Sequence, residues 1–219
     1  MLRMRFAKTD NGVWISHLDL MRLFQRAFKR AGLPLKHSQG FTPRPLVSIA
    51  LPLSVGVESV CELLDFELEG ACAAPEEIEK RLNKTLVPGI SVLEVYENGQ
   101  KLKELSFLRS TVTLEYDAGI PAGCADAVTE LFAREQLCME KKGKNGSREQ
   151  DIIPMLRSLE VRPTGDGCLA LEAVVCAQNP SLNPMLLAGA VERYLPEYTP
   201  DFVRCRRDEL LDEALSIFR

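Results

Sequence analysis

The chain has 219 residues and a net charge of −4, with 46% hydrophobic and 26% charged residues. These values are typical of a water-soluble globular protein that can bury a core in one large or two small domains. They exclude a generic nucleic-acid coat protein, which would be strongly basic. The apolar runs fall short of the about 20 residues that a membrane helix needs, so we expect no membrane contact.

Cysteine usage predicts the cellular compartment. The seven cysteines are odd in number and show no CxxC spacing, which argues against a disulfide framework and against a structural zinc site. The first ten residues, MLRMRFAKTD, lack the apolar stretch of a signal peptide. We therefore expect a cytoplasmic protein with no cofactor and no metal site.

The first hundred residues alternate between strand and helix patterns. Asn11-Gly12 predicts a turn after the first strand, and Pro88-Gly89 ends the second helix. The order of elements predicts a ferredoxin-like (βαββαβ) domain over residues 1–100. The expected strands cover residues 2–8, 47–51, 61–69 and 90–96, and the expected helices cover 17–31 and 75–86.

Residues 101–219 repeat that order more loosely and predict a second ferredoxin-like domain. The fold class is therefore α+β, with two tandem ferredoxin-like domains and antiparallel sheets. A hairpin turn is expected at Gly165-Asp166-Gly167. The expected strands cover residues 106–116, 136–142, 159–162, 168–176 and 202–206, the helices cover 124–134 and 183–194, a polar loop covers 141–151, and a short helical turn falls within 152–159.

The helix over residues 17–31 carries the clearest pattern in the chain. Ser16 is a good N-cap, and Asp19 approximates a capping box at the positive end of the helix. Gly32 supplies the C-cap and Pro34 prevents continuation. Apolar residues recur at the spacing of a buried helix face, at Leu20, Met21, Phe24, Ala27, Phe28 and Ala31.

The opposite side of this helix carries Arg22, Arg26 and Arg30, with Lys29 beside them. A solvated helix face often looks like this. Here, however, residues 1–48 contain nine Lys or Arg and two acids, a net of +7 in a chain of net −4. A basic segment on an acidic body predicts a localised site for a polyanion.

A stiff polar loop follows the helix. Pro43 and Pro45 restrict the backbone, and Gly40 permits a close approach to a ligand. The loop is either a cradle for an anion or nucleotide, with Phe41 offering a stacking face, or an ordinary connector stiffened by its prolines. Its candidate anion-binding residues are Lys36, Ser38, Gly40, Phe41 and Arg44, with His37 among them.

These residues resemble a known family. SHLDLMR (16–22), SQGFTPRP (38–45) and PLSVGVES (52–59) are similar to the opening motif of the radical-SAM-linked domain family, which occurs alone or fused to radical-SAM proteins. Position 44 commonly holds histidine in that family and is arginine here. The resemblance implies a radical-SAM protein as a partner. The chain itself lacks the CxxxCxxC cluster of a radical-SAM centre.

Three functions remain open from the sequence. The first is an accessory RNA-binding or substrate-presenting module, with RNA and no DNA as its expected ligand; Lys142 and Arg148 in the polar loop would add to its basic surface. The second is a metal-independent endoribonuclease in which His17 or His37 transfers protons. The third is a protein-interaction domain that docks on a radical-SAM partner.

Overall fold

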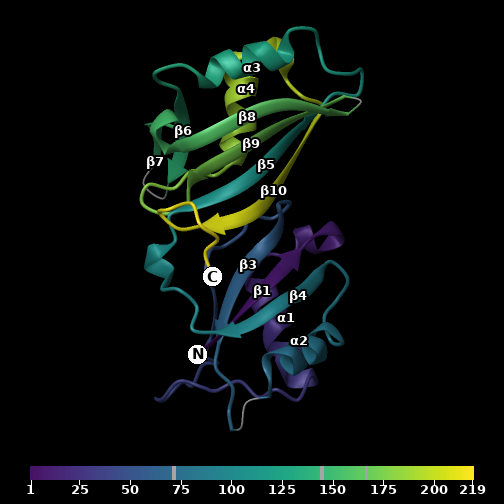
Figure 1. Ribbon diagram of the computed structural model, residues 1–219, viewed down its shortest axis with the longest axis vertical. Coiled ribbons are helices and arrows are strands. Elements are labelled where there is room, and N and C mark those ends of the chain that lie inside the picture. Colours follow the sequence, from purple (N-terminus) through teal and green to yellow (C-terminus); the bar gives the residue numbers. More distant parts are fainter. Residues whose placement is uncertain (71–72, 144–145, 166) are drawn as a thin grey trace. The chain divides into compact units, whose positions relative to one another are not determined.

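The computed structural model describes residues 1–70, 73–143, 146–165 and 167–219 (Figure 1). The side chains of 141–148 lie outside this description. The chain divides into two compact units, Met1–Leu102 together with Arg219, and Lys103–Phe218. No helix in the described ranges is long and apolar enough to cross a membrane.

The first unit is an antiparallel sheet with two helices on one face. Its strands lie in the order β4-β1-β3-β2, and each neighbouring pair is antiparallel. The strands are β1 (Leu2–Lys8), β2 (Val47–Ile49), β3 (Glu58–Phe66) and β4 (Ile90–Glu97); the helices are α1 (His17–Arg30) and α2 (Pro75–Asn83), with a 3-10 turn η1 (Asp10–Trp14) before α1 and another, η2 (Leu102–Glu104), at the end of the unit.

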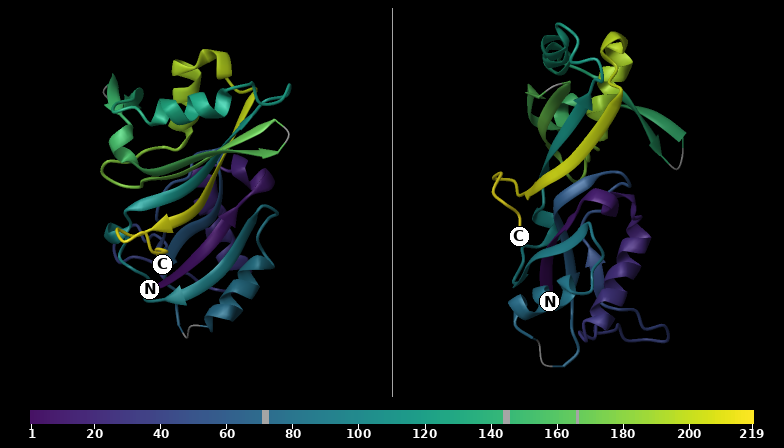
Figure 2. Two further views of the ribbon diagram at one scale, coloured as in Figure 1. Left: turned by 45° about the horizontal axis from the view of Figure 1, so that its top comes forward. Right: turned by 90° about the vertical axis from the view of Figure 1, so that its right-hand side faces the viewer.

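Two aromatic pairs join α1 to this sheet. Phe6 packs edge-on against Phe24, and Phe28 packs against Phe66, with 4.8 Å between ring centroids in each pair. All four rings are almost fully buried, and burying such a side chain contributes about 1.5–3 kcal/mol. Figure 2 shows α1 and α2 on the same side of the sheet. The predicted apolar face of the helix is confirmed, and it fixes which face of α1 remains toward solvent.

The ends of α1 are also confirmed. The Ser16 Oγ accepts a hydrogen bond from the Asp19 backbone N–H at 3.2 Å and donates one to the Asp19 carboxylate at 2.8 Å. At the other end, Gly32 has a φ of +64° and the helix stops. The Arg81 guanidinium of α2 donates to the carbonyls of Ala31 and Gly32, which satisfies the free acceptors of the helix terminus.

The second unit has the same plan with one addition. Its sheet runs β10-β5-β9-β8, again with antiparallel pairs, while β6 and β7 form a separate two-stranded sheet. The strands are β5 (Phe107–Glu115), β6 (Cys138–Gly143), β7 (Gly146–Asp151), β8 (Leu156–Gly165), β9 (Cys168–Cys176) and β10 (Phe202–Leu211); the helices are α3 (Cys124–Phe132) and α4 (Met185–Tyr194), with 3-10 turns η3 (Ile153–Met155) and η4 (Pro196–Tyr198).

Several predicted boundaries were wrong. The last part of the predicted polar loop is instead strand β7, which pairs with β6. At the end of this strand pair, the Asp151 carboxylate accepts hydrogen bonds from the Leu137 and Ile153 N–H groups at 2.9 and 3.2 Å. The helical turn expected within 152–159 is limited to Ile153–Met155, because strand β8 starts at Leu156 and pairs with β9. Strand β3 starts three residues early and β10 ends five residues late, since each has a partner strand over the extra length. Residue 166 of the predicted hairpin turn lies outside the described residues.

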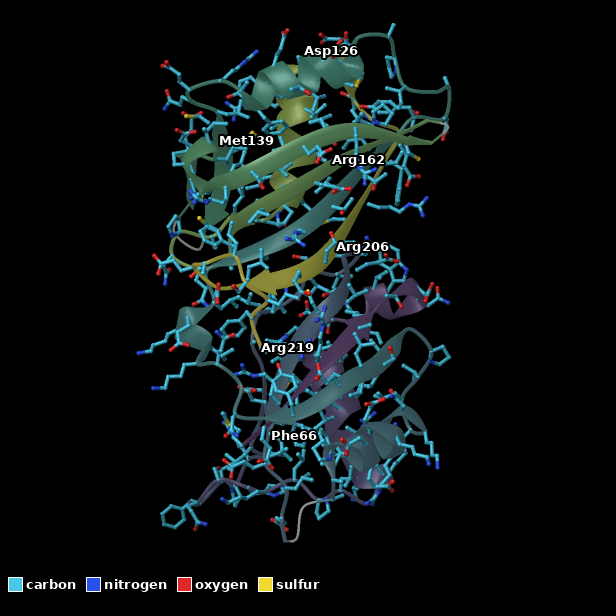
Figure 3. All side chains as sticks on the ribbon, viewed as in Figure 1. Phe66, Asp126, Met139, Arg162, Arg206 and Arg219 are labelled. Atoms are coloured by element: carbon cyan, nitrogen blue, oxygen red, sulfur yellow. The ribbon has the colours of Figure 1, made fainter. Side chains whose placement is uncertain are left out.

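The sheet of the second unit carries arginines that are already paired. Arg162 pairs with Glu172, Arg204 with Glu115, and Arg206 with Asp208 (Figure 3). Three of the cysteines, Cys61, Cys124 and Cys205, are buried in the two units, and burial raises the pKa of the Cys205 thiol to about 12. These features belong to the folded scaffold of the two units.

Candidate nucleic-acid interface

Helix α1 forms one wall of an open groove of about 480 Å³ in the first unit, which we call the arginine groove. Arg22, Arg26 and Arg30 recur every four residues, so they lie in one row with a spacing of about 6 Å along the helix. Apolar side chains of Ile15, Leu23 and Val87 also line it. Asp19 completes the lining.

A close contact of two backbones supports the far wall of the arginine groove. Gly89 has a φ of +85°, and a Cβ placed there would lie 2.7 Å from the backbone nitrogen of Gly12 and 2.5 Å from the carbonyl oxygen of Thr9. The Thr9 N–H donates to the Gly89 carbonyl at 2.8 Å. Glycine at both positions therefore lets the segment before α1 lie against the turn that carries Val87.

The charge in the arginine groove is incompletely neutralised. Arg22 forms an ion pair of 3.0 Å with Asp19, and both side chains are more than 60% exposed. Arg30 donates to the Thr85 carbonyl at 2.7 Å. This hydrogen bond orients the guanidinium but does not neutralise its positive charge. Arg26 forms no hydrogen bond or ion pair with any residue that the structure describes. The pKa of Asp19 is lowered by the hydrogen bond from Ser16 and by Arg22, so the groove holds three positive charges and one negative charge at neutral pH.

The loop after α1 is a stiff hairpin. His37 and Pro45 form a β-bridge, Ser38 N–H donates to the Arg44 carbonyl at 2.8 Å, and Arg44 N–H donates to the Ser38 hydroxyl at 3.1 Å. Its tip is exposed, and the Phe41 ring is in full contact with solvent. Lys36 is paired with Glu67 at 2.9 Å, and this contact lowers the pKa of Glu67. Arg44 is therefore the loop's exposed cation without an acidic partner in the described part of the chain.

The predicted site residues separate into two groups within the first unit. Arg22, Arg26 and Arg30 line the arginine groove, whereas His37 lines a second groove of about 460 Å³ on the other side of α1. Ser38, Gly40, Phe41 and Arg44 line neither of these two grooves. The second groove is lined by Gln25, Phe28, Lys29, Gly32, Leu33, Pro34, Leu35, His37, Pro45 and Glu69.

The two histidines are separated by the length of α1. His17 is the first residue of this 14-residue helix, which is about 20 Å long, and His37 follows its other end. The His17 Nδ1 is buried and has no hydrogen-bond partner among the described residues, while the His37 Nδ1 lies 3.8 Å from a Glu69 carboxylate oxygen. The two rings therefore do not share one site. A ribonuclease mechanism in which His17 or His37 transfers protons stays a prediction.

The remaining basic candidates belong to the second unit. Lys142 and Arg148 lie on β6 and β7, but their side chains are outside the described residues, so the structure leaves their role as a prediction. No cluster of three or more metal-ligating side chains occurs in the described ranges.

Sequence reasoning missed Trp14. This residue ends η1, its side chain is 67% exposed, and its ring lies beside Gly56. Its chain neighbour Ile15 lines the arginine groove. The sequence did contain a signal for it. The only tryptophan of the chain lies two residues before the N-cap of the basic helix, and this position is outside the apolar face of that helix.

Comparisons with known proteins give a family and a distant likeness of fold. Residues 1–184 match the family model described as "Uncharacterized protein conserved in bacteria (DUF2344)". Among solved structures, the chain is similar over 95% of its length to 48% of a chain in a Cbf5-Nop10-Gar1 complex, with 9% identity and a TM-score of 0.51. It is similar over 94% of its length to 46% of a chain in an H/ACA RNP bound to a substrate RNA, with 9% identity and a TM-score of 0.46. The chain thus spans about half the length of these solved chains. No curated protein sequence matches it.

Proposed function

The chain belongs to the bacterial family DUF2344, and we propose that it is an accessory RNA-binding module whose RNA contact is the arginine groove. The observation that carries this proposal is the row of Arg22, Arg26 and Arg30 along an open groove with a single acid. The likeness to solved complexes concerns the fold alone, so the proposal depends on this charge pattern and on the chemistry of the groove.

Phosphate recognition explains why arginines suit this position. A guanidinium presents several N–H donors in a plane and binds phosphate oxygens through paired hydrogen bonds. A spacing of about 6 Å between successive arginines is close to the separation of consecutive phosphates along a nucleic-acid strand. The apolar side chains of Ile15, Leu23 and Val87 can contact sugars and base faces between the phosphates.

The loop after α1 supplies a second contact in this proposal. Its exposed Phe41 ring offers a stacking face. Lys36, Ser38, Gly40 and Arg44 of the same loop would contribute the donors for phosphate. In the second unit, Lys142 and Arg148 would provide a further basic contact with RNA. The module would then hold RNA through phosphates and stacked bases, without chemistry of its own.

We also propose the finer architecture and setting. Each unit would be a ferredoxin-like domain. In a βαββαβ unit of this kind the strands lie in the spatial order fourth, first, third, second. The orders β4-β1-β3-β2 and β10-β5-β9-β8 both follow this pattern. The domains would cover residues 1–100 and 101–219. The motif resemblance at residues 16–59 implies a cytoplasmic radical-SAM protein as the partner to which RNA is presented.

The salt dependence of RNA binding tests the proposed function. Three phosphate contacts predict that a plot of log K against log salt concentration has a slope between about −2 and −3. Replacing Arg26 with alanine is expected to reduce this slope by about 1. Fluorescence anisotropy of a labelled RNA, measured over a salt series, gives both values. A protein that binds no RNA at low salt, or binds it with no salt dependence, would contradict the proposal.

The ion pair inside the groove gives a prediction in the opposite direction. Replacing Asp19 with asparagine removes the negative charge beside Arg22 and keeps the shape of the side chain. One more uncompensated charge is expected to raise RNA affinity about fivefold at 100 mM salt. The matched control is Glu76→Gln, which removes an exposed acid of α2 outside the groove. Equal affinities of Asp19→Asn and Glu76→Gln would show that RNA binds elsewhere.

A further inference from the structure

We infer that the arginine groove takes RNA as a single strand and that one of its bases stacks on Trp14. This inference rests on the proposed function and adds the form of the RNA and the residue that reads it. The observation behind it is independent of the charge pattern: the large apolar ring of Trp14 is exposed to solvent, although the protein has a core that could bury it. A tryptophan commonly buries about 150–250 Å².

The backbone that carries Trp14 is held in place from several sides. The Ile15 N–H donates to the Gly12 carbonyl at 3.0 Å, and the Gly56 N–H donates to the Val13 carbonyl at 2.9 Å. The buried ammonium of Lys8 donates to the same Val13 carbonyl at 3.0 Å. The indole is therefore presented from a fixed support, which lowers the entropy lost when a ligand binds to it.

The position of Trp14 relative to the arginines favours a nucleic-acid strand. Ile15, the chain neighbour of Trp14, lines the end of the arginine groove nearest the start of α1. In this inference, a strand that passes Arg22 leaves the groove at that end and brings its next base to the exposed indole. Phosphates would lie on the arginine row while the next base meets the ring. Aromatic rings and basic grooves are combined in this way in single-strand-binding proteins.

The chemistry excludes an intact duplex as the preferred form. Bases within a duplex are stacked on each other and offer no free face to a side chain, whereas an unpaired strand does. Leu18 and Val55, which are 66% and 54% exposed, would supply apolar edges at this end of α1. A protein partner would also be attracted by exposed apolar side chains, but the adjoining row of cations selects a polyanion.

The test uses the intrinsic fluorescence of Trp14, since the chain contains one tryptophan. The intact protein is titrated with an unpaired oligouridylate of about ten nucleotides and, separately, with an RNA duplex of the same length. We expect the single strand to quench Trp14 emission, with a midpoint equal to that of the anisotropy of a labelled strand. The duplex is expected to leave the emission unchanged.

Two variants at position 14 complete the test. Trp14→Ala is expected to weaken single-strand binding about tenfold, and Trp14→Phe to restore most of it, because a ring still stacks on a base. Circular dichroism of both variants checks the fold, and the exposed position of the side chain predicts no change. Single-strand binding without quenching, and with unchanged affinity of Trp14→Ala, would overturn this inference and leave the proposed function intact. Absence of any RNA binding would overturn both.

Discussion

Replacing Asp65 with alanine is expected to lower the free energy of unfolding by about 3–5 kcal/mol, because it leaves a buried arginine without its counter-charge. Arg3 and Asp65 face each other across β1 and β3 and are 4% and 7% exposed. The Arg3 guanidinium donates to both Asp65 oxygens, at 2.6 and 3.0 Å, and to the Gln100 carbonyl at 2.8 Å. Burial alone would lower the pKa of Arg3, but the hydrogen bonds and charges of Asp65 and, to a smaller extent, Tyr96 together outweigh it and raise that pKa.

Urea unfolding followed by circular dichroism measures the effect of Asp65→Ala. The control is the double variant Arg3→Met with Asp65→Leu, which replaces both charges by apolar groups of similar volume. Such replacements are often neutral or stabilising, so the double variant is expected to recover most of the lost stability. A loss below about 1 kcal/mol in Asp65→Ala would show that water or another group already compensates Arg3.

Local sequence patterns were enough to predict α1. The spacing of Leu20, Phe24 and Phe28, the N-cap Ser16 and the helix stop at Gly32 all depend on residues close in the chain. The structure confirms the buried face and the N-cap, and it places the positive-φ Gly32 directly after the C-cap Ala31. Strand β7 was missed because its polar sequence has no alternation, and its pairing with β6 decides its conformation. Pairing between strands is non-local, so the ends of β3, β8 and β10 could not be read from their own residues.

The arrangement of the candidate site depended on similar long-range contacts. The basic helix and the 36–45 loop are neighbours in the chain, and both were predicted to bind an anion. In the structure, Lys36 N–H donates to the Glu67 carbonyl and Leu35 bridges to Leu68, so the loop follows the end of β3 and His37 lies across α1 from the arginine row. These contacts join residues about thirty positions apart, so no local sequence pattern predicts them.

The triple variant Arg22→Ala, Arg26→Ala, Arg30→Ala is expected to bind RNA about 100-fold more weakly at 100 mM salt. Each phosphate contact releases counterions from the RNA, and for a single strand three contacts change log K by about 0.7 per contact and per tenfold change in salt. The same relation predicts that the difference between the variant and the native protein falls below about tenfold at 400 mM salt. Convergence at high salt therefore distinguishes a phosphate role from a loss of folded protein, which would persist at every salt concentration.

A matched lysine variant separates the arginine groove from net charge. Lys80→Ala, Lys84→Ala, Lys101→Ala removes the same number of positive charges from exposed positions of the first unit outside the groove. Long-range attraction between exposed charges is screened beyond about 10 Å at 0.1 M salt, so this control is expected to retain nearly native affinity and slope. If the two triple variants lose affinity equally, RNA responds to the overall charge of the unit, and the row of arginines along α1 has no special part in holding it.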